Sequence, residues 1–285
     1  MSPIGGALFI YICLHAYLFV LRIPLSARLS ISGKTYPYMN QINTANKYSI
    51  LSAYVTIVTI GGRNQCEIYV MNANIKEHWE NIYTTKQPND VSWTQQVPTT
   101  SLEFIHAYNI PKTAKIIDIG GGDSKLVDYL LMDGYKNISV LDISSAAINR
   151  AKKRLGDRAT EVKWIVSDIL DFQPTEKYDV WHDRAAFHFQ KEPDKIDSYL
   201  KILHTAVDGI VIIGTFSIDG PKNCSGLVVK QYEEKSMIEL FEQHCFKNIS
   251  CKREDHITPA GATQHFIFCS FMKEPVLLKK RGDQI

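Results

Sequence analysis

The sequence has no excess of either charge, and this absence argues against a nucleic-acid partner. Its 285 residues contain 32 Lys and Arg against 30 Asp and Glu, a net charge of +2. Proteins that hold a phosphate backbone usually carry a strong basic patch. The short basic segments at residues 152–154 and 279–281 are more typical of a solvated surface. We therefore expect no nucleic acid among the partners.

Cysteine is also sparse and follows no recognisable pattern. The six cysteines include no CxxC pair and no Cys/His spacing that would suit zinc, so we expect no metal site. Scattered cysteines are typical of free thiols in a reducing compartment, where most serve as small core residues. On this basis we expect the main domain to be cytoplasmic.

No apolar run has the full length of a membrane span. Residues 7–21 form an apolar run of 15 residues, interrupted only by His15, whereas a span needs about 20 residues. No Lys or Arg precedes the run, as one would in a secretory signal. We interpret residues 1–73 as an extension: a membrane anchor or signal, a targeting segment, or residues upstream of a true start near Met71. Membrane contact is expected only through residues 7–21.

Phosphate-binding loops are missing, although a glycine turn is present. The apolar residues 115–119 run into Gly120, Gly121 and Gly122, and a helical pattern follows. Glycine lets the backbone approach a ligand closely, and a helix N-terminus presents free N–H groups. A dinucleotide turn would need glycine where Lys125 stands, and no GxxxxGK[ST] motif occurs. The turn therefore suits a nucleoside ligand without phosphates to cradle.

From about residue 74 the sequence alternates between strand-like and helical patterns. Such alternation predicts a mostly parallel sheet with helices on both faces, and two late strands without a helix between them predict an antiparallel pair at one edge. The expected strands are 115–119, 138–142, 162–166, 178–182, 210–216, 249–253 and 264–272. The expected helices are 75–83, 99–108, 124–132, 144–155, 193–206 and 233–245. Ser144 is the expected N-cap of its helix, and Gly156 is the expected stop.

Three carboxylates stand at the ends of successive expected strands, where an open α/β sheet binds its ligand. Asp142 lies 20 residues after Gly122, and a carboxylate offers two acceptor oxygens to the two hydroxyls of a ribose. Asp168 could accept from an exocyclic amine on adenine. Asp118 could hold the glycine turn or a ligand ammonium. A turn or capping role is the plain alternative for any one of them.

These segments resemble the motifs of class I S-adenosylmethionine-dependent methyltransferases. The resemblance rests on residues 118–122, 140–144 and 167–169, and it extends over residues 74–273, which leaves 274–285 as a C-terminal tail. It implies a Rossmann-like α/β fold: a seven-stranded, mostly parallel sheet with an antiparallel C-terminal hairpin and helices on both faces. It also implies S-adenosyl-L-methionine as the cofactor.

The resemblance assigns cofactor contacts position by position. The first acid and the three glycines would surround the methionine part. The second acid would accept from the ribose hydroxyls, with the next residue beside the adenine, and the third acid and its neighbour would face the adenine amine and ring. The cofactor-binding residues implied in this way are Asp118, Gly120, Gly121, Gly122, Asp142, Ile143, Asp168 and Ile169.

The fourth expected strand would end where methyl donor and acceptor meet. Residues 178–189 lack the Asn/Asp-Pro-Pro-Tyr/Phe pattern of amide and adenine N-methyltransferases. They are similar to the Trp-Asp-Arg-Gly segment of thiopurine-type enzymes and to the Asp-Lys-Gly segment of some lysine methyltransferases, with Ala185 in place of the glycine. The expected catalytic residues are Asp183, as amine ligand or base, His182, as proton acceptor, and Arg184, as the holder of an anionic substrate.

The main functional hypothesis is methyl transfer to a small-molecule acceptor, with a protein lysine as the alternative acceptor. A nucleoside-binding module without chemistry and a nicotinamide-dependent dehydrogenase are further alternatives, and Lys125 disfavours the second. Trp79, Tyr83 and Trp93 resemble a helix and loop that cover the pocket in small-molecule members of the family. His188 is a further candidate proton acceptor.

Overall fold

The computed structural model divides into two compact units, and the division falls at residue 75 of the chain. The residues that it describes are 28–31, 34–37, 53–60, 63–70 and 75–274. The apolar run 7–21 lies outside these residues, so its expected membrane contact stays a prediction, as do the proposed domain boundaries. Among the described residues, no helix combines the length and the apolar character that crossing a membrane requires.

The first unit contains a small sheet in the order β2-β1-β3-β4. Its strands are β1 (Arg28–Ile31), β2 (Lys34–Pro37), β3 (Ala53–Ile60) and β4 (Arg63–Val70). β1 runs parallel to β3, and the other two pairs are antiparallel. The β-branched residues of β3 favour an extended backbone. From the sequence we expected only an extension here and no sheet.

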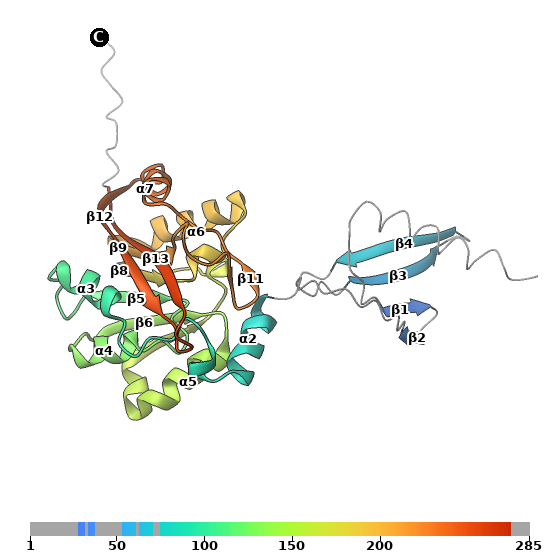
Figure 1. Ribbon diagram of the computed structural model, residues 1–285, viewed down its shortest axis with the longest axis horizontal. Coiled ribbons are helices and arrows are strands. Elements are labelled where there is room, and N and C mark those ends of the chain that lie inside the picture. The colour runs from blue at the N-terminus through green and yellow to red at the C-terminus, as the bar shows by residue number, and fades with distance from the viewer. Residues whose placement is uncertain (1–27, 32–33, 38–52, 61–62, 71–74, 275–285) are drawn as a thin grey trace, which may run out of the picture. The chain divides into compact units, whose positions relative to one another are not determined.

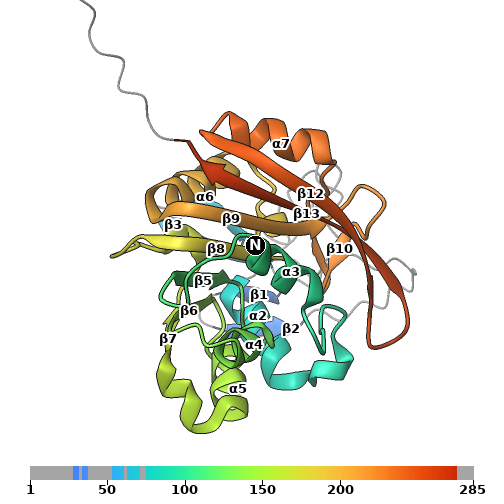
Figure 2. The same cartoon turned by 90° about the vertical axis from the view of Figure 1, so that its left-hand side faces the viewer.

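The second unit is built on a sheet of seven strands in the order β12-β13-β9-β8-β5-β6-β7. Figure 2 shows β9, β8, β5, β6 and β7 following one another in this order. The strands are β5 (Lys115–Ile119), β6 (Asn137–Asp142), β7 (Val162–Val166), β8 (Tyr178–Arg184), β9 (Val207–Phe216), β12 (Phe246–Ile257) and β13 (Thr263–Lys273). β5 to β9 pair in parallel, and β13 is antiparallel to both neighbours. The predicted Rossmann-like sheet with a C-terminal antiparallel hairpin is therefore confirmed.

Helices cover both faces of this sheet (Figure 1). Strand residues alternate between faces, so Ile117 and Ile119 share one core with α6 and α7, whereas Ile116 and Val140 share another with α3 and α4. The helices are α2 (Ile75–Thr85), α3 (Thr99–Ala107), α4 (Leu126–Met132), α5 (Ser145–Leu155), α6 (Pro193–Ala206) and α7 (Glu234–Glu242). Short 3-10 turns are η1 (Pro88–Asp90), η2 (Gly156–Glu161), η3 (Ile169–Asp171) and η4 (Phe187–Phe189), and β10 (Asn223–Cys224) pairs with β11 (Leu227–Val228).

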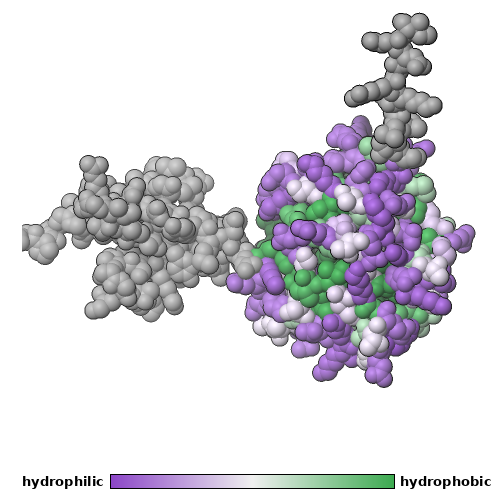
Figure 3. Space-filling model, turned by 180° about the vertical axis from the view of Figure 1, so that it is seen from behind, coloured by the Kyte–Doolittle hydropathy of each residue, from purple (hydrophilic) through white to green (hydrophobic). Residues whose placement is uncertain are grey.

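Apolar surface is spread unevenly over the second unit. Hydrophobic residues gather near the middle of the face that Figure 3 shows, and hydrophilic residues surround them. The exposed large apolar side chains of the described residues are Ile75, Val97, Met132, Val166, Ile218, Val228, Ile249, Ile257 and Met272. They come from many different elements, and single apolar side chains on a surface do not by themselves indicate a binding face.

Helix boundaries follow the sequence signals closely. The hydroxyl of Ser144 accepts from the backbone N–H of Ala147, and Gly156 ends α5 with a φ of 58°, so both capping predictions are confirmed. α4 begins at Leu126, two residues later than predicted, because the side chain of Ser124 accepts from the Leu126 N–H and forms a turn first.

The prediction of free thiols is wrong for Cys251 and Cys269. These residues form a disulfide between β12 and β13. They lie directly opposite each other in the antiparallel register, with 4.1 Å between their Cα atoms. Spacing along the chain did not reveal the pair because it depends on the register of the hairpin. The cysteine pattern therefore no longer supports a reducing compartment, and a cytoplasmic location stays a prediction.

Candidate active site

The candidate site lies at the carboxyl ends of the parallel strands, where the strand order reverses. β5 has β6 on one side and β8 on the other, and the chain adds its later parallel strands outward from both. Ligands of open α/β sheets bind in the crevice at such a point. The glycine turn follows β5 directly, so it borders this crevice.

The glycine turn leaves no room for side chains. A Cβ atom on Gly121 would lie 2.5 Å from Oδ2 of Asp118, and one on Gly122 would lie 2.8 Å from Oδ2 of Asp142. Gly120 and Gly122 also have positive φ values of 63° and 44°, which favour glycine. The backbone therefore passes directly against the two acids that are predicted to bind the cofactor.

Asp142 is buried beside the turn. Its Oδ1 accepts a 2.8 Å hydrogen bond from the backbone N–H of Ser144, while Oδ2 faces Gly122. Burial raises the pKa of Asp142 to about 7; the Ser144 bond opposes this shift, and three neighbouring acids add to it. A hydroxyl that donates to Oδ2 would favour the ionised carboxylate, so ligand binding and ionisation are coupled here.

Asp118 is held in place by a buried histidine. Nδ1 of His182 lies 2.7 Å from Oδ1 of Asp118, and Nε2 lies 2.9 Å from the Ser101 hydroxyl. All three side chains are buried. Both ring nitrogens of His182 are thus engaged, so these contacts give no support to its predicted role as a proton acceptor. They orient Asp118, whose Oδ2 lies against Gly121.

The predicted adenine-binding residues lie at the ends of β6 and β7. Asp168 is the N-cap of η3, where its Oδ1 accepts from the Leu170 N–H at 2.9 Å. Ile169 is buried in the core under α6, and Ile143 is half-buried directly after Asp142. Asp168 therefore has a capping role in the structure, and the adenine contacts of these residues stay predictions.

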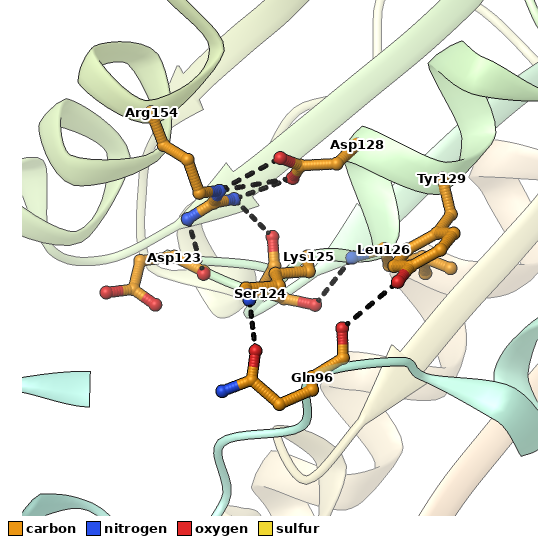
Figure 4. A network of polar contacts seen from close by, with 8 residues as sticks. All are labelled: Gln96, Asp123, Ser124, Lys125, Leu126, Asp128, Tyr129 and Arg154. Carbon is orange, nitrogen blue, oxygen red and sulfur yellow. Dashed lines mark hydrogen bonds and ion pairs between the residues drawn. The ribbon is translucent and has the colours of Figure 1, made fainter. Parts of the chain in front are cut away.

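Arg154 on α5 braces the segment between the glycine turn and α4 (Figure 4). Its Nη1 donates to the backbone oxygen of Asp123 at 2.9 Å, and its Nη2 donates to that of Ser124 at 2.8 Å. The same guanidinium pairs with the carboxylate of Asp128 at 2.8 Å. A single side chain thus satisfies carbonyls that the turn leaves unpaired.

Lys125, which breaks the dinucleotide motif, connects the same region to the loop before α3. Its Nζ donates to the side-chain oxygen of Gln96, and the Tyr129 hydroxyl donates to the Gln96 backbone oxygen at 3.3 Å (Figure 4). Lys125 therefore links the segment after the glycine turn to the loop before α3.

Glu80 fastens α2 across the start of α5. Its Oε2 accepts from the Ser144 hydroxyl at 2.8 Å and from the Ala146 N–H at 3.2 Å, and its Oε1 accepts from the Ser145 hydroxyl at 2.7 Å. Burial raises the pKa of Glu80, but the bonds from Ser145 and Ser144 outweigh it, and the pKa is lowered overall. A carboxylate at this helix N-terminus is further stabilised by the helix dipole.

Aromatic side chains of α2, of the loop that follows it and of η4 form a cluster next to the glycine turn. The Trp79 ring lies 5.7 Å from the Trp93 ring and 5.1 Å from the Phe189 ring, and the Tyr83 ring lies 6.2 Å from Trp93. The Tyr83 hydroxyl lies 2.9 Å from the position of a Cβ atom on Gly122. α2, the following loop and η4 therefore meet above the turn.

Asp183 is fully buried and holds the turn that follows β8. Its Oδ1 accepts from the N–H groups of Ala186 and Phe187 at 2.9 and 3.0 Å, and its Oδ2 accepts from the Tyr199 hydroxyl at 2.7 Å. Burial raises the pKa of Asp183 to about 6, against the effect of these bonds and of His182. Both oxygens are occupied, so its predicted role toward a substrate gains no support and stays a prediction.

Arg184 points to the opposite face of β8 from Asp183. Its Nη1 donates to the Trp93 backbone oxygen at 3.0 Å, and its guanidinium carbon lies 4.6 Å from the centre of the Phe266 ring. His188 is fully buried nearby, and its Nδ1 accepts from the Phe216 N–H at 3.5 Å. Burial and then the Arg184 charge lower the pKa of His188 to about 3, so it is neutral at physiological pH.

The structure thus brings some predicted site residues together and separates others. Asp118, Asp142, His182 and the glycines converge on the turn after β5, whereas Asp183 and Arg184 face different cores. Sequence reasoning missed Glu80 and Arg154 because charged residues on amphipathic helices ordinarily point into solvent. Among the described residues, no group of three or more His, Cys, Asp or Glu side chains could hold a metal ion.

We predict that Glu80→Gln loosens α2 over the site. The amide keeps one acceptor oxygen but loses the charge at the α5 N-terminus, which costs about 1 kcal/mol of unfolding free energy. Hydrogen exchange of the α2 amides should become faster, with the exposed Glu77→Gln as the matched control. Equal protection of α2 in both variants would show that Glu80 does not hold the helix.

We predict that Asp183→Asn acts on stability before it acts on catalysis. The Tyr199 oxygen already accepts from Nε1 of Trp181 at 2.9 Å, so an amide nitrogen facing it would leave the hydroxyl proton without an acceptor. The expected cost is about 1–3 kcal/mol in chemical denaturation. Tyr199→Phe is the companion variant because it removes the same bond from the other side. A large loss of turnover with unchanged stability would instead favour the catalytic role.

Comparison with known proteins agrees with this arrangement. Residues 116–208 match the family described as a methyltransferase domain. The chain is 31% identical over 109 residues to malonyl-[acyl-carrier protein] O-methyltransferase 2 of Ilyobacter polytropus, a match that covers 36% of the chain and 40% of that protein. It is 28% identical over 110 residues to the eEF1A lysine and N-terminal methyltransferase of Mus musculus, covering 38% of the chain and 16% of that protein. The matches thus span well under half of these relatives.

Solved structures share the fold over more of the chain. The 1,6-didemethyltoxoflavin-N1-methyltransferase of Burkholderia thailandensis, solved with S-adenosylhomocysteine, superposes with a TM-score of 0.56 at 17% identity and covers 78% of this chain and 95% of its own. The N-methyltransferase NodS of Bradyrhizobium japonicum, solved with the same nucleoside, has a TM-score of 0.55 at 12% identity and covers 70% and 99%. The segment 116–208 is thus similar to a methyltransferase domain, and the second unit shares the fold of these solved methyltransferases.

Proposed function

We propose that the protein transfers the methyl group of S-adenosylmethionine to a small-molecule nucleophile. The observation that carries this proposal is the glycine turn pressed against Oδ2 of Asp118 and of Asp142 at the end of β5. In this arrangement Asp142 accepts from the ribose hydroxyls and Asp118 faces the ammonium of the methionine part. Ile143, Asp168 and Ile169 lie toward the adenine.

The methyl donor is already activated as a sulfonium, so the protein contributes position and exclusion of water. In an in-line displacement the new bond to the acceptor forms as the carbon–sulfur bond breaks, and the electron pair stays on sulfur. His182 keeps Asp118 oriented, and the cluster of Trp79, Tyr83 and Trp93 excludes water from above.

The aromatic cover favours a small acceptor over a protein one. Glu80 fastens α2 to the start of α5, so the aromatic side chains of α2 are held beside the turn, and a site with such a cover suits a molecule that can be enclosed. A protein lysine is the second candidate acceptor, because one relative is named as a lysine methyltransferase. A labelled-methyl assay on cell extract, split into metabolite and protein fractions, distinguishes the two.

Calorimetric titration tests the cofactor assignment directly. We expect saturable binding of S-adenosylmethionine and S-adenosylhomocysteine and none of NAD. Failure of both sulfur nucleosides to bind, with NAD binding instead, would overturn the proposed function.

We predict that Asp142→Ala weakens S-adenosylhomocysteine binding by about 1–3 kcal/mol, the scale of a lost hydrogen bond to a charged group. The Ala variant loses both acceptor oxygens, whereas Asp142→Asn keeps one and should lie between. Asp171→Asn, in the same part of the fold, is the control for a general effect of charge. Wild-type affinity in both Asp142 variants would exclude the ribose contact.

We predict that cofactor affinity rises with pH through about 7. The pKa of Asp142 is about 7 without ligand, so below that value the carboxyl is protonated and a proton must leave before it can accept from both hydroxyls. Affinity at pH 6 should therefore be about tenfold lower than at pH 8, with the difference gained across that window. Asp142→Asn has no such proton, and its affinity should be flat over the same range. A flat profile in the wild type would contradict the coupling.

A further inference from the structure

Arg184 has an unused binding edge. Its Nη1 donates to the Trp93 backbone oxygen, but Nε and Nη2 are buried and have no hydrogen-bond partner. Nε and Nη2 form the side-on edge of a guanidinium, whose two parallel N–H groups match the two oxygens of a carboxylate. Leaving two charged donors buried and unpaired is costly, so this edge is expected to have a partner in the working protein.

The surroundings of Arg184 keep it charged and add a further donor. Burial lowers its pKa only to about 10, and the neighbouring acids, Glu254 first, oppose the shift. Since Nδ1 of His188 accepts from the Phe216 N–H, Nε2 carries the proton, and this buried N–H also has no partner. Both unpaired groups are donors near one another, and an anion is the ligand that accepts from both.

Among the acids near Arg184, Glu254 has the largest effect on its charge and is the candidate for a partner within the protein. Its Oε1 accepts from the side chain of Gln95 at 2.9 Å, its Oε2 is buried without a hydrogen-bond partner, and within residues 75–274 no ion pair within 4.0 Å joins it to Arg184. It lines a groove of about 610 Å³ together with His256, Asn89 and residues of the loop before α3, among them Gln95 and Gln96. The charge of Glu254 therefore acts on Arg184, but its carboxylate forms no hydrogen bond or ion pair with the Nε–Nη2 edge.

We propose that the Nε–Nη2 edge of Arg184 binds a carboxylate group of the methyl acceptor, with Nε2 of His188 as an additional donor. This inference rests on the proposed function, because it places the acceptor at the carboxyl end of β8, next to the turn after β5. It makes Arg184 a binding residue that determines specificity and selects anionic acceptors over neutral or cationic ones. The Phe266 ring holds the guanidinium plane from one side.

The test compares an acid with its neutral isostere. Phenylacetate, phenylacetamide and phenyl phosphate are titrated into the protein saturated with S-adenosylhomocysteine and followed by ligand-observed NMR. We expect phenylacetate to bind about tenfold more tightly than phenylacetamide, the scale of hydrogen bonds to a charged group. Phenyl phosphate tests whether a tetrahedral anion is bound as well, and tighter binding of it than of the acid would overturn the choice of carboxylate.

Two variants assign the preference to Arg184. Arg184→Gln should abolish the preference for the acid, and Arg184→Lys should keep part of it, because an ammonium retains the charge without the bidentate edge. Arg253→Gln, an exposed arginine paired with Asp219, is the matched control and should behave as wild type. Equal binding of acid and amide, or an unchanged preference in Arg184→Gln, would overturn the inference.

The test of Arg184 can be distinguished from a test of the proposed methyltransferase function. Calorimetry with S-adenosylhomocysteine on the same variants reports on the cofactor site alone, and it should be unchanged in Arg184→Gln. Retained nucleoside binding also shows that the variant is folded. Loss of acid preference with intact nucleoside binding supports the inference. Intact nucleoside binding without any acid preference in the wild type rejects it and leaves the methyltransferase proposal standing.

Discussion

The close approach of the backbone to two acids after β5 is the constraint on which the rest of the site depends. A single methyl group at Gly121 or Gly122 would collide with Asp118 or Asp142, and one at Gly120 would lie 2.7 Å from the Cβ of Ala186. The turn must therefore be fixed from outside, by groups that reach over it. Three charged side chains supply such bonds. Arg154 donates to the Ser124 backbone oxygen, Lys125 donates to Gln96, and Glu80 accepts from Ser144.

Crowding of negative charge is the direct consequence of that geometry. Burial is the main cause of the raised pKa of Asp142, and the nearby acids Asp118, Asp123 and Glu80 add to it, whereas the hydrogen bonds to Glu80 lower the pKa of that carboxyl. Each acid other than Asp142 has strong donors: His182 for Asp118, serines for Glu80, and Arg150 for Asp123. The carboxylate left least satisfied is the one aimed at the ligand crevice, which is typical of a group whose partner is a ligand.

The sequence predicted what depends on local chemistry and missed what depends on distant contacts. The order of the helices and of the strands of the seven-stranded sheet, the capping by Ser144 and the stop at Gly156 follow from short-range patterns and were predicted. The disulfide of Cys251 needs a register that local sequence does not specify. Glu80 lies 64 positions from Ser144 in the chain, so no local pattern could identify it as a cap for α5.

The alternation of β8 gives two adjacent charged residues different surroundings. Asp183 and Arg184 are neighbours in the chain, yet a strand sends them to opposite faces. On one face, the Tyr199 hydroxyl of α6 donates to one carboxylate oxygen of Asp183, and two backbone N–H groups of the turn after β8 donate to the other. On the other face, the guanidinium of Arg184 lies against the Phe266 ring, and its Nη1 donates to one carbonyl. Its Nε and Nη2 have no hydrogen-bond partner.

An anionic acceptor also fits the state of the titratable groups around the end of β8. Both ring nitrogens of His182 are occupied, the carboxylate of Asp183 is occupied, and His188 is neutral with its free nitrogen protonated. These three side chains are thus poorly placed to remove a proton from a neutral or cationic acceptor. A lysine ammonium is repelled by the guanidinium of Arg184, whereas a carboxylate group of the acceptor is attracted to it. The surroundings of Asp183 and Arg184 therefore favour the proposed acceptor with a carboxylate group, which Arg184 attracts, over a cationic acceptor.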